Sequence, residues 1–137
     1  FVVLGEPAPW CVYTRRGSPS KGFVALQAWQ EQIRAAIINK YGRPMLAGAV
    51  ELDLVFGRTL PKPWPKDINA MHRRIATAIV RKPDVTNLQK GFEDALKGVL
   101  LVDDSQVVRI MGKKRFVTPG MAPLTYCKLT VLPEVLE

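Results

Sequence analysis

Residues 82–98 read Lys82-Pro83-Asp84-Val85-Thr86-Asn87-Leu88-Gln89-Lys90-Gly91-Phe92-Glu93-Asp94-Ala95-Leu96-Lys97-Gly98. Leu88 and Phe92 recur at the spacing of one face of an α-helix, so the segment predicts an amphipathic helix whose apolar side packs against a core. Thr86 and Gln89 match the Ser/Thr-x-x-Gln capping box that begins many helices. We therefore expect a helix from about Thr86 to Lys97, with charged residues before, along and after it.

Upstream of this helix, strand and helix signals alternate along the chain. The apolar residues 1–4 predict a short strand, and the prolines and glycines that follow predict a loop. Apolar residues at helical spacing predict a helix over residues 24–41, and alternating apolar and polar residues over 50–56 predict a strand with one buried face. Prolines break the basic segment 58–83, and a short helix is expected within it, over about 68–80.

Downstream of the same helix, the sequence predicts a turn and two strands. Residues 103–105, Asp-Asp-Ser, are typical of a polar turn. Residues 106–111 predict a strand, the basic run 113–115 predicts a hairpin tip, and 124–132 predict a last strand that pairs with the strand before it. The expected order is β-α-β-(α)-α-β-β, in a single domain over residues 1–137.

The composition is that of a basic, globular domain. Of 137 residues, 20 are Lys or Arg and 12 are Asp or Glu, which gives a net charge of +8 and a pI near 9.8. The chain is 47% hydrophobic, enough to bury a core, and its apolar runs are far shorter than the roughly 20 residues of a membrane helix. The basic surplus favours polyanionic partners, of which nucleic acid is the most common.

The first residues, the two cysteines and the single histidine argue against a signal peptide and against zinc or redox sites. The first residues lack the basic and apolar pattern of a signal peptide, so we expect a cytoplasmic protein. Cys11 and Cys127 are far apart and belong to no Cys-x-x-Cys or Cys/His cluster, which argues against a zinc or redox site. His72 stands alone among arginines and is not expected to bind metal.

Negative charge is concentrated in one part of the chain. Five of the 12 acidic residues fall within 21 residues: Asp84, Glu93, Asp94, Asp103 and Asp104. Carboxylates held together repel one another unless cations offset them, and Mg²⁺ prefers oxygen ligands from carboxylates, phosphate and water. Such a site suits phosphodiester hydrolysis. The same residues are also compatible with local roles as a helix N-terminal charge, an i,i+4 surface pair and a polar turn.

Three short segments resemble the RusA family of Holliday-junction resolvases. That family's pattern is close to Lys/Arg-Pro-Asp-x-Asp-Asn-Leu-x-Lys, followed by Asp-Ala-Leu and then by Asp-Asp-x-Gln-Val. The matching segments here are Lys82-Pro83-Asp84-Val85-Thr86-Asn87-Leu88-Gln89-Lys90, Asp94-Ala95-Leu96 and Asp103-Asp104-Ser105-Gln106-Val107. The order of the expected elements agrees along nearly the whole chain. The resemblance implies an α+β (mixed α/β) fold, in which a mixed sheet packs against two main helices.

The resemblance also implies an activity. It implies a homodimeric, Mg²⁺-dependent endonuclease, with Mn²⁺ as an alternative metal, that binds four-way DNA junctions and resolves them by paired symmetric nicks in recombination and repair. Such enzymes are encoded by bacteria or their prophages and need neither a membrane nor a small-molecule cofactor. By position, Asp84 and Asp104 resemble metal-binding aspartates, with Asp103 beside Asp104, and Lys90 resembles an essential lysine. These four residues form the expected catalytic set.

One position departs from the family's pattern, because Thr86 stands where a second aspartate is usual. A neutral hydroxyl is a weaker ligand of Mg²⁺ than a carboxylate. Thr86 either ligates weakly or only caps the helix, and Asp103 or Asp94 is an alternative source of the missing carboxylate. Two other functions stay open: a non-catalytic, structure-selective DNA-binding protein with a degenerate metal site and, from net charge alone, a small RNA-binding or RNA-processing protein.

Contacts to DNA are expected mainly between basic side chains and phosphates, so that binding depends on salt and selects junction shape. The candidates lie in expected loops, in the short helix expected over about 68–80 and at the expected hairpin tip: Arg15, Arg16, Lys21, Arg73, Arg74, Arg81, Lys82, Lys113, Lys114 and Arg115. A two-fold-symmetric homodimer would place two sites on opposing strands of a junction.

Overall fold

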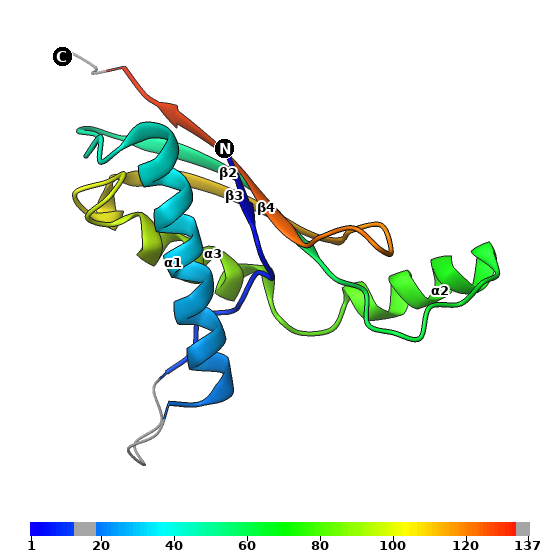
Figure 1. Ribbon diagram of the computed structural model, residues 1–137. Helices are drawn as coiled ribbons and strands as arrows, with labels where there is room; N and C mark the ends of the chain where they lie inside the picture. The colour runs from blue at the N-terminus through cyan, green and yellow to red at the C-terminus, as the bar shows by residue number, and fades with distance from the viewer. Residues whose placement is uncertain (13–18, 134–137) are drawn as a thin grey trace.

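Four strands form one mixed sheet in the computed structural model, which describes residues 1–12 and 19–133 (Figure 1). The strands are β1 (Val2–Leu4), β2 (Val50–Arg58), β3 (Val107–Phe116) and β4 (Leu124–Val131), and their order across the sheet is β1-β4-β2-β3. The central strand β2 runs antiparallel to β4 and parallel to β3, and β1 pairs antiparallel with the first residues of β4. The strands β1 and β3 are therefore the two edges of the sheet.

The described part of the chain contains three α-helices, α1 (Lys21–Tyr41), α2 (Ile68–Ile79) and α3 (Val85–Leu96), and a short 3-10 helix, η1 (Asp104–Gln106). The helices α1 and α3 lie together on one face of the sheet, whereas α2 projects away from it as an arm (Figure 1). None of these helices is long and apolar enough to cross a membrane. The predicted α+β fold, a mixed sheet against two main helices, is confirmed.

The core lies between the sheet and the helices α1 and α3. Trp29 of α1, Phe56 of β2 and Phe92 of α3 are fully buried, and their ring centroids lie 6.0 to 6.4 Å apart. Burying one Phe side chain contributes about 1.5–3 kcal/mol. Gly91 permits the close approach of the two helices, because a Cβ at this position would lie 3.0 Å from Leu26 Cδ1. This packing fixes α3, and with it the charged residues at both of its ends.

The predicted hairpin between the last two strands is wrong. The strand β2 separates β3 from β4, because the alternating, apolar β2 pairs with both of them. The basic run 113–115 is also not a hairpin tip, since it lies within β3 and pairs with residues 55–57 of β2. As an edge strand, β3 can carry lysines, which are common on sheet edges because they oppose association with further strands.

The helices begin close to their predicted positions. Helix α2 lies where it was expected. Helix α1 begins three residues earlier than predicted, with Ser20 as its N-cap and a hydrogen bond from the Phe23 N–H to the Ser20 hydroxyl (3.1 Å). Such a cap typically stabilises a helix by about 1 kcal/mol. Lys21, predicted in a loop, is therefore the first residue of α1.

Helix α3 begins at Val85, with Asp84 at the N-cap position and Thr86 in the first turn. The capping box predicted from Thr86 and Gln89 is therefore wrong. The Gln89 side chain instead lies against Gly112 of β3, where the missing Cβ leaves the space that the amide occupies. Gly112 thus lets α3 pack closely on the edge strand.

Candidate active site

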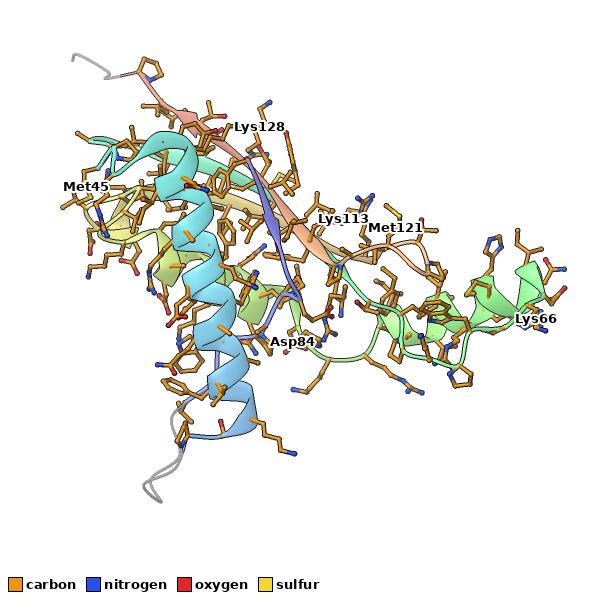
Figure 2. All side chains as sticks on the ribbon, viewed as in Figure 1. Met45, Lys66, Asp84, Lys113, Met121 and Lys128 are labelled. Atoms are coloured by element: carbon orange, nitrogen blue, oxygen red, sulfur yellow. The ribbon has the colours of Figure 1, made fainter. Side chains whose placement is uncertain are left out.

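Asp84 ends the loop before α3 and occupies the N-cap position of that helix (Figure 2). Its backbone carbonyl accepts hydrogen bonds from the N–H groups of Asn87 (3.1 Å) and Leu88 (3.2 Å), whereas its carboxylate makes no capping hydrogen bond. The side chain is exposed at the end of the helix where the dipole favours negative charge. Asp84 therefore presents carboxylate oxygens that are available to a ligand.

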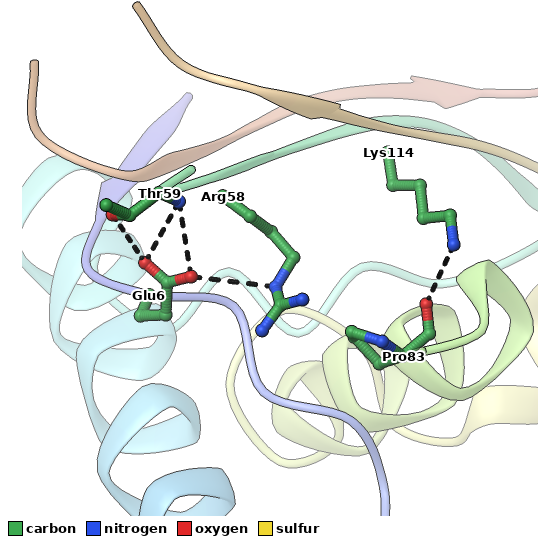
Figure 3. Close-up of polar contacts among 5 residues, drawn as sticks. All are labelled: Glu6, Arg58, Thr59, Pro83 and Lys114. Atoms are coloured by element: carbon green, nitrogen blue, oxygen red, sulfur yellow. Dashed lines mark hydrogen bonds and ion pairs between the residues drawn. The ribbon is translucent and has the colours of Figure 1, made fainter. Parts of the chain in front are cut away.

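Lys114 of β3 holds the loop before Asp84 in place. Its ammonium donates hydrogen bonds to the carbonyls of Arg81 (2.8 Å) and Pro83 (3.1 Å), the second of which is drawn in Figure 3. Hydrogen bonds from charged groups contribute about 1.5–3 kcal/mol. Lys114 was predicted to contact DNA, and the structure places its ammonium on carbonyls of the protein itself.

A cavity of about 350 Å³ opens at the start of α3. It is lined by Pro9, Trp10, Arg58, Lys82, Pro83, Asp84 and Asn87. The lining combines one carboxylate with two cations and a side-chain amide, so a phosphate can enter beside the carboxylate. Arg58 was not among the sequence candidates, because it belongs to no motif, although it lies in the basic segment 58–83.

The ammonium of Lys90 lies over the indole ring of Trp10, 3.6 Å from the ring centroid. The backbone N–H of Trp10 donates a hydrogen bond to the carbonyl of Asn87 (3.0 Å), which fixes the segment after β1 against α3. A cation over an indole ring is worth about 0.5–2 kcal/mol. Trp10 thus holds Lys90 beside the Asp84 cavity that its own side chain lines.

A second acidic group lies near the other end of α3. Burial raises the pKa of Glu93 above its ordinary value of 4.5, and the charges of Asp104 and Asp94 raise it further. Burial also raises the pKa of Asp94, where the charge of Lys90 opposes the shift and that of Asp104 adds to it. Carboxylates that repel one another in this way favour the approach of a cation. Glu93 was not a predicted ligand, although the sequence analysis counts it in the acidic cluster of residues 84–104.

Asp103 and Asp104 are neighbours with different surroundings. The Asp103 carboxylate accepts a hydrogen bond from the Ser105 N–H (3.1 Å) and forms an ion pair with Lys97 (3.3 Å). Hydrogen bonding by Ser105, followed by the contact with Lys97, lowers the pKa of Asp103. Asp104 is exposed, and its carboxylate has no hydrogen bond or ion pair within the described ranges. Asp104 is therefore the better placed of the two to accept a ligand.

Gln106 fixes the turn that carries this pair. Its side-chain oxygen accepts hydrogen bonds from the N–H groups of Val102 (2.8 Å) and Asp103 (3.0 Å). Its amide nitrogen donates to the carbonyls of Leu46 (2.8 Å) and Gly48 (2.9 Å), just before β2. Asp103 and Gln106 thus form a capping box for η1, and the two hydrogen bonds donated by the Gln106 amide tie the turn to the segment before β2.

Within one chain, the length of α3 separates the two acidic groups. Asp84 precedes Glu93 by nine residues, which corresponds to roughly 14 Å of helical rise. The structure brings Asp104 together with Glu93 and Asp94, and does not bring Asp84 together with Asp103 or Asp104. In residues 1–12 and 19–133, no three Asp, Glu, His or Cys side chains are placed to hold one metal ion. The donor chemistry still fits Mg²⁺, which takes one or two carboxylates together with phosphate and water.

The predicted DNA-binding residues lie in several places. Four of them line, with Arg58, a cavity of about 500 Å³ between α2 and the ends of β2 and β3: Arg73, Arg74, Arg81 and Lys82. Three others are exposed: Lys21 at the start of α1, and Lys113 (Figure 2) and Arg115 on β3. Arg15 and Arg16 lie outside the described residues.

Comparisons with known proteins agree with these features. The model of the family described as endodeoxyribonuclease RusA matches residues 13–121. The uncharacterized protein YqaN of Bacillus subtilis (strain 168) is 32% identical over 127 aligned residues, which cover 83% of this chain and 84% of that protein. The matched region includes Asp84, Lys90 and Asp104, as well as the arm formed by α2. This chain belongs to the RusA family of endodeoxyribonucleases.

Proposed function

We propose that this protein is a Mg²⁺-dependent endodeoxyribonuclease that binds four-way DNA junctions and resolves them by paired symmetric nicks. Membership of the RusA family supports the reaction class. The observation that carries the proposal is the carboxylate of Asp84, which makes no capping hydrogen bond and lies at a cavity that Arg58 and Lys82 also line. Metal-dependent phosphodiester cleavage uses carboxylates that bind the metal, together with cations that bind the phosphate.

Asp84 and Asp104, the second beside Glu93, are the residues that would hold the metal. When bound, Mg²⁺ or Mn²⁺ makes water a stronger nucleophile at neutral pH and offsets negative charge on the phosphate. Because Asp84 and Asp104 lie near opposite ends of α3, we infer that a complete set of ligands requires a second copy of the chain. A two-fold-symmetric homodimer also matches the symmetry of a four-way junction.

Lys90 is the residue that we assign to the charge of the reacting phosphate. It lies on the same helix as Asp84, about two turns further along, and Trp10 holds its ammonium beside the Asp84 cavity. A cation that is held in place before the reaction stabilises developing negative charge with little reorganisation. Removal of Lys90 is therefore expected to slow cleavage more than it weakens DNA binding.

Junction binding would depend mainly on contacts between basic side chains and phosphates. The cations of the cavity beside α2 and the exposed Lys113 and Arg115 supply these contacts. Each neutralised phosphate releases counterions, so the affinity for DNA should fall steeply as the salt concentration rises. Contacts to phosphates give no information about the base sequence, so the protein should recognise the junction by its shape.

A cleavage assay tests the proposal. A labelled synthetic four-way junction and a matched linear duplex are each incubated with the protein in Mg²⁺, Mn²⁺ or EDTA. We expect paired nicks in the junction only when metal is present, and none with Asp84→Asn. The control is Asp53→Asn, because Asp53 pairs with Arg109 on the face of the sheet that α1 and α3 do not cover. Cleavage that persists in Asp84→Asn or in EDTA would contradict the proposal.

A non-catalytic, structure-selective DNA-binding protein is the second candidate function. Thr86 offers only an exposed hydroxyl, and the described residues of one chain do not gather three metal ligands, which together favour weak metal binding. In the same assay, tight junction binding without cleavage in any metal would identify this alternative. A stronger affinity for structured RNA than for the junction would instead indicate an RNA-binding protein.

A further inference from the structure

The cavity at Asp84 adjoins the larger cavity beside α2, because Arg58 and Lys82 line both. We propose that the two cavities form one track for the backbone of a single DNA strand, and that Arg58 positions the phosphate that reaches Asp84. This inference rests on the proposed function. It adds a path for the substrate strand and a positioning residue that no motif marks.

The lining of the larger cavity is basic and contains no acidic residue. Five of its lining side chains are cations, namely Arg58, Arg73, Arg74, Arg81 and Lys82, and none is Asp or Glu. A cleft lined by charges of one sign concentrates ligands of the other sign. The Nε atoms of Arg58 and Arg74 are shielded from solvent and make no hydrogen bond in the described structure, although the Nε of Arg58 lies in an ion pair with Glu6. A phosphodiester backbone is the polyanion that suits this lining.

Arg58 is held along one edge of its guanidinium group. Glu6 lies 3.5 Å from its Nε and also accepts hydrogen bonds from Thr59, from the N–H at 3.3 Å and from the hydroxyl at 3.0 Å (Figure 3). The two terminal nitrogens of Arg58 have no partner among the residues described, and the side chain is 28% exposed. An arginine offers these nitrogens as a planar fork that matches two phosphate oxygens. Glu6 thus orients Arg58 and leaves its phosphate-binding groups available.

Helix α2 carries Arg73 and Arg74 and contributes nothing to the core, because it has no buried side chain. Asp67 caps its first turn, and the Trp64 indole N–H donates to the carbonyl of Leu60 (2.7 Å) in the loop before it. Arg74 donates a hydrogen bond to the carbonyl of Pro61, which joins α2 to that loop. Helix α2 thus forms one wall of the larger cavity and presents its cations there.

Two measurements on the full chain test the track. Junction affinity is measured in EDTA at several salt concentrations, and single-turnover cleavage is measured in Mg²⁺ with enzyme in excess. For Arg58→Gln we expect cleavage about tenfold slower and a Kd raised no more than about threefold. The salt slope, meaning the slope of log Kd against the logarithm of the salt concentration, should be smaller by about 0.9, which corresponds to the loss of one phosphate contact. Arg73 lies further from Asp84 along the track. For Arg73→Gln we therefore expect a similar decrease in the salt slope and a smaller decrease in the cleavage rate.

Two control variants separate positioning from folding. Glu6→Gln removes the charge that pairs with Arg58 but keeps the arginine, so its cleavage should fall far less than that of Arg58→Gln. Arg109→Gln removes an arginine that pairs with Glu51 and Asp53 on the uncovered face of the sheet. Its salt slope and cleavage rate should match those of the wild type.

The outcomes distinguish the track from the proposed function. If the wild type binds junctions but does not cut them, the proposed function fails, while smaller salt slopes in Arg58→Gln and Arg73→Gln still support the track. The track is overturned if Arg58→Gln matches Arg109→Gln in both slope and rate.

Discussion

The ammonium of Lys90 lies 3.6 Å from the centre of the Trp10 ring, although 80 positions separate the two residues in the sequence. Trp10 also lines the Asp84 cavity, and its backbone N–H is bonded to the carbonyl of Asn87. The contact therefore connects the segment after β1 to the candidate active site on α3. It gives a tryptophan of the loop after β1 a direct part in placing Lys90.

Loss of the Trp10 ring should displace Lys90. Trp10→Ala is expected to slow single-turnover cleavage of a junction by about 2- to 30-fold, the equivalent of a cation–π contact of about 0.5–2 kcal/mol. Trp10→Phe keeps an aromatic face and should slow cleavage less. Both rates are compared with enzyme in excess, so that differences in affinity do not enter. A Trp10→Ala protein that cuts at the wild-type rate would show that Lys90 does not depend on the ring.

Loss of Lys114 should loosen the loop before Asp84. Lys114→Met removes the donor to the Arg81 and Pro83 carbonyls, so the free energy of unfolding should fall by about 1.5–3 kcal/mol. Lys113→Met is the matched control, because Lys113 is exposed and successive side chains of a strand point to opposite faces. Urea denaturation measures both changes. Equal stability of the two variants would contradict a positioning role for Lys114.

Glu93 should make folding stability depend on pH. Its raised pKa means that the ionised form is disfavoured in the folded state, so the penalty is absent below the ordinary pKa of 4.5 and grows as pH rises through the folded-state pKa. Glu93→Gln should therefore raise the urea midpoint at about pH 7 and leave it nearly unchanged at about pH 3. Urea titrations at both pH values measure the difference. A gain of the same size at both would mean that the carboxylate charge is not its cause.

Asp103 and Asp104 should separate stability from activity. The contacts that lower the pKa of Asp103 stabilise the folded state at pH values above its ordinary pKa of 3.8. This contribution is lost as the pH falls through the folded-state pKa. Asp103→Asn should therefore lower the Tm at neutral pH, with a difference that disappears in acid. Asp104→Asn removes a charge that repels Glu93 and Asp94, so it should not lower the Tm but should abolish metal-dependent cleavage. Thermal unfolding and junction cleavage of the two variants check both halves of this prediction.

Local sequence patterns were sufficient to predict the main elements. The spacing of Leu88 and Phe92 predicts α3, and the alternation over residues 50–56 predicts β2, because one-sided burial leaves a periodic pattern in the sequence. The identity of the strands that pair with a given strand leaves no such pattern in the sequence. The pairing of β3 with β2 depends on how the chain crosses the sheet, so nearness in sequence wrongly predicted a hairpin of β3 with β4.

The candidate site was predictable as a set of residue types and not as an arrangement. The motif marks Asp84, Lys90 and Asp104, but their surroundings come from distant segments, such as Trp10 against Lys90 and Arg58 beside the Asp84 cavity. Side-chain contacts of this kind depend on the packed fold. The resemblance singles out Asp104 of the Asp103-Asp104 pair, and the structure adds a physical difference: Asp103 is held by Ser105 and Lys97, whereas Asp104 is exposed.

A supercoiled plasmid with an extruded cruciform gives the most direct test of paired nicking. Two nicks made within the lifetime of one complex convert the plasmid to its linear form, whereas a single nick gives a relaxed circle. With wild-type protein we predict a linear product that requires Mg²⁺ or Mn²⁺, and with Asp84→Asn we predict that the plasmid stays supercoiled. Relaxed circles as the main wild-type product, or a plasmid that stays intact in every metal, would contradict paired cleavage at Asp84.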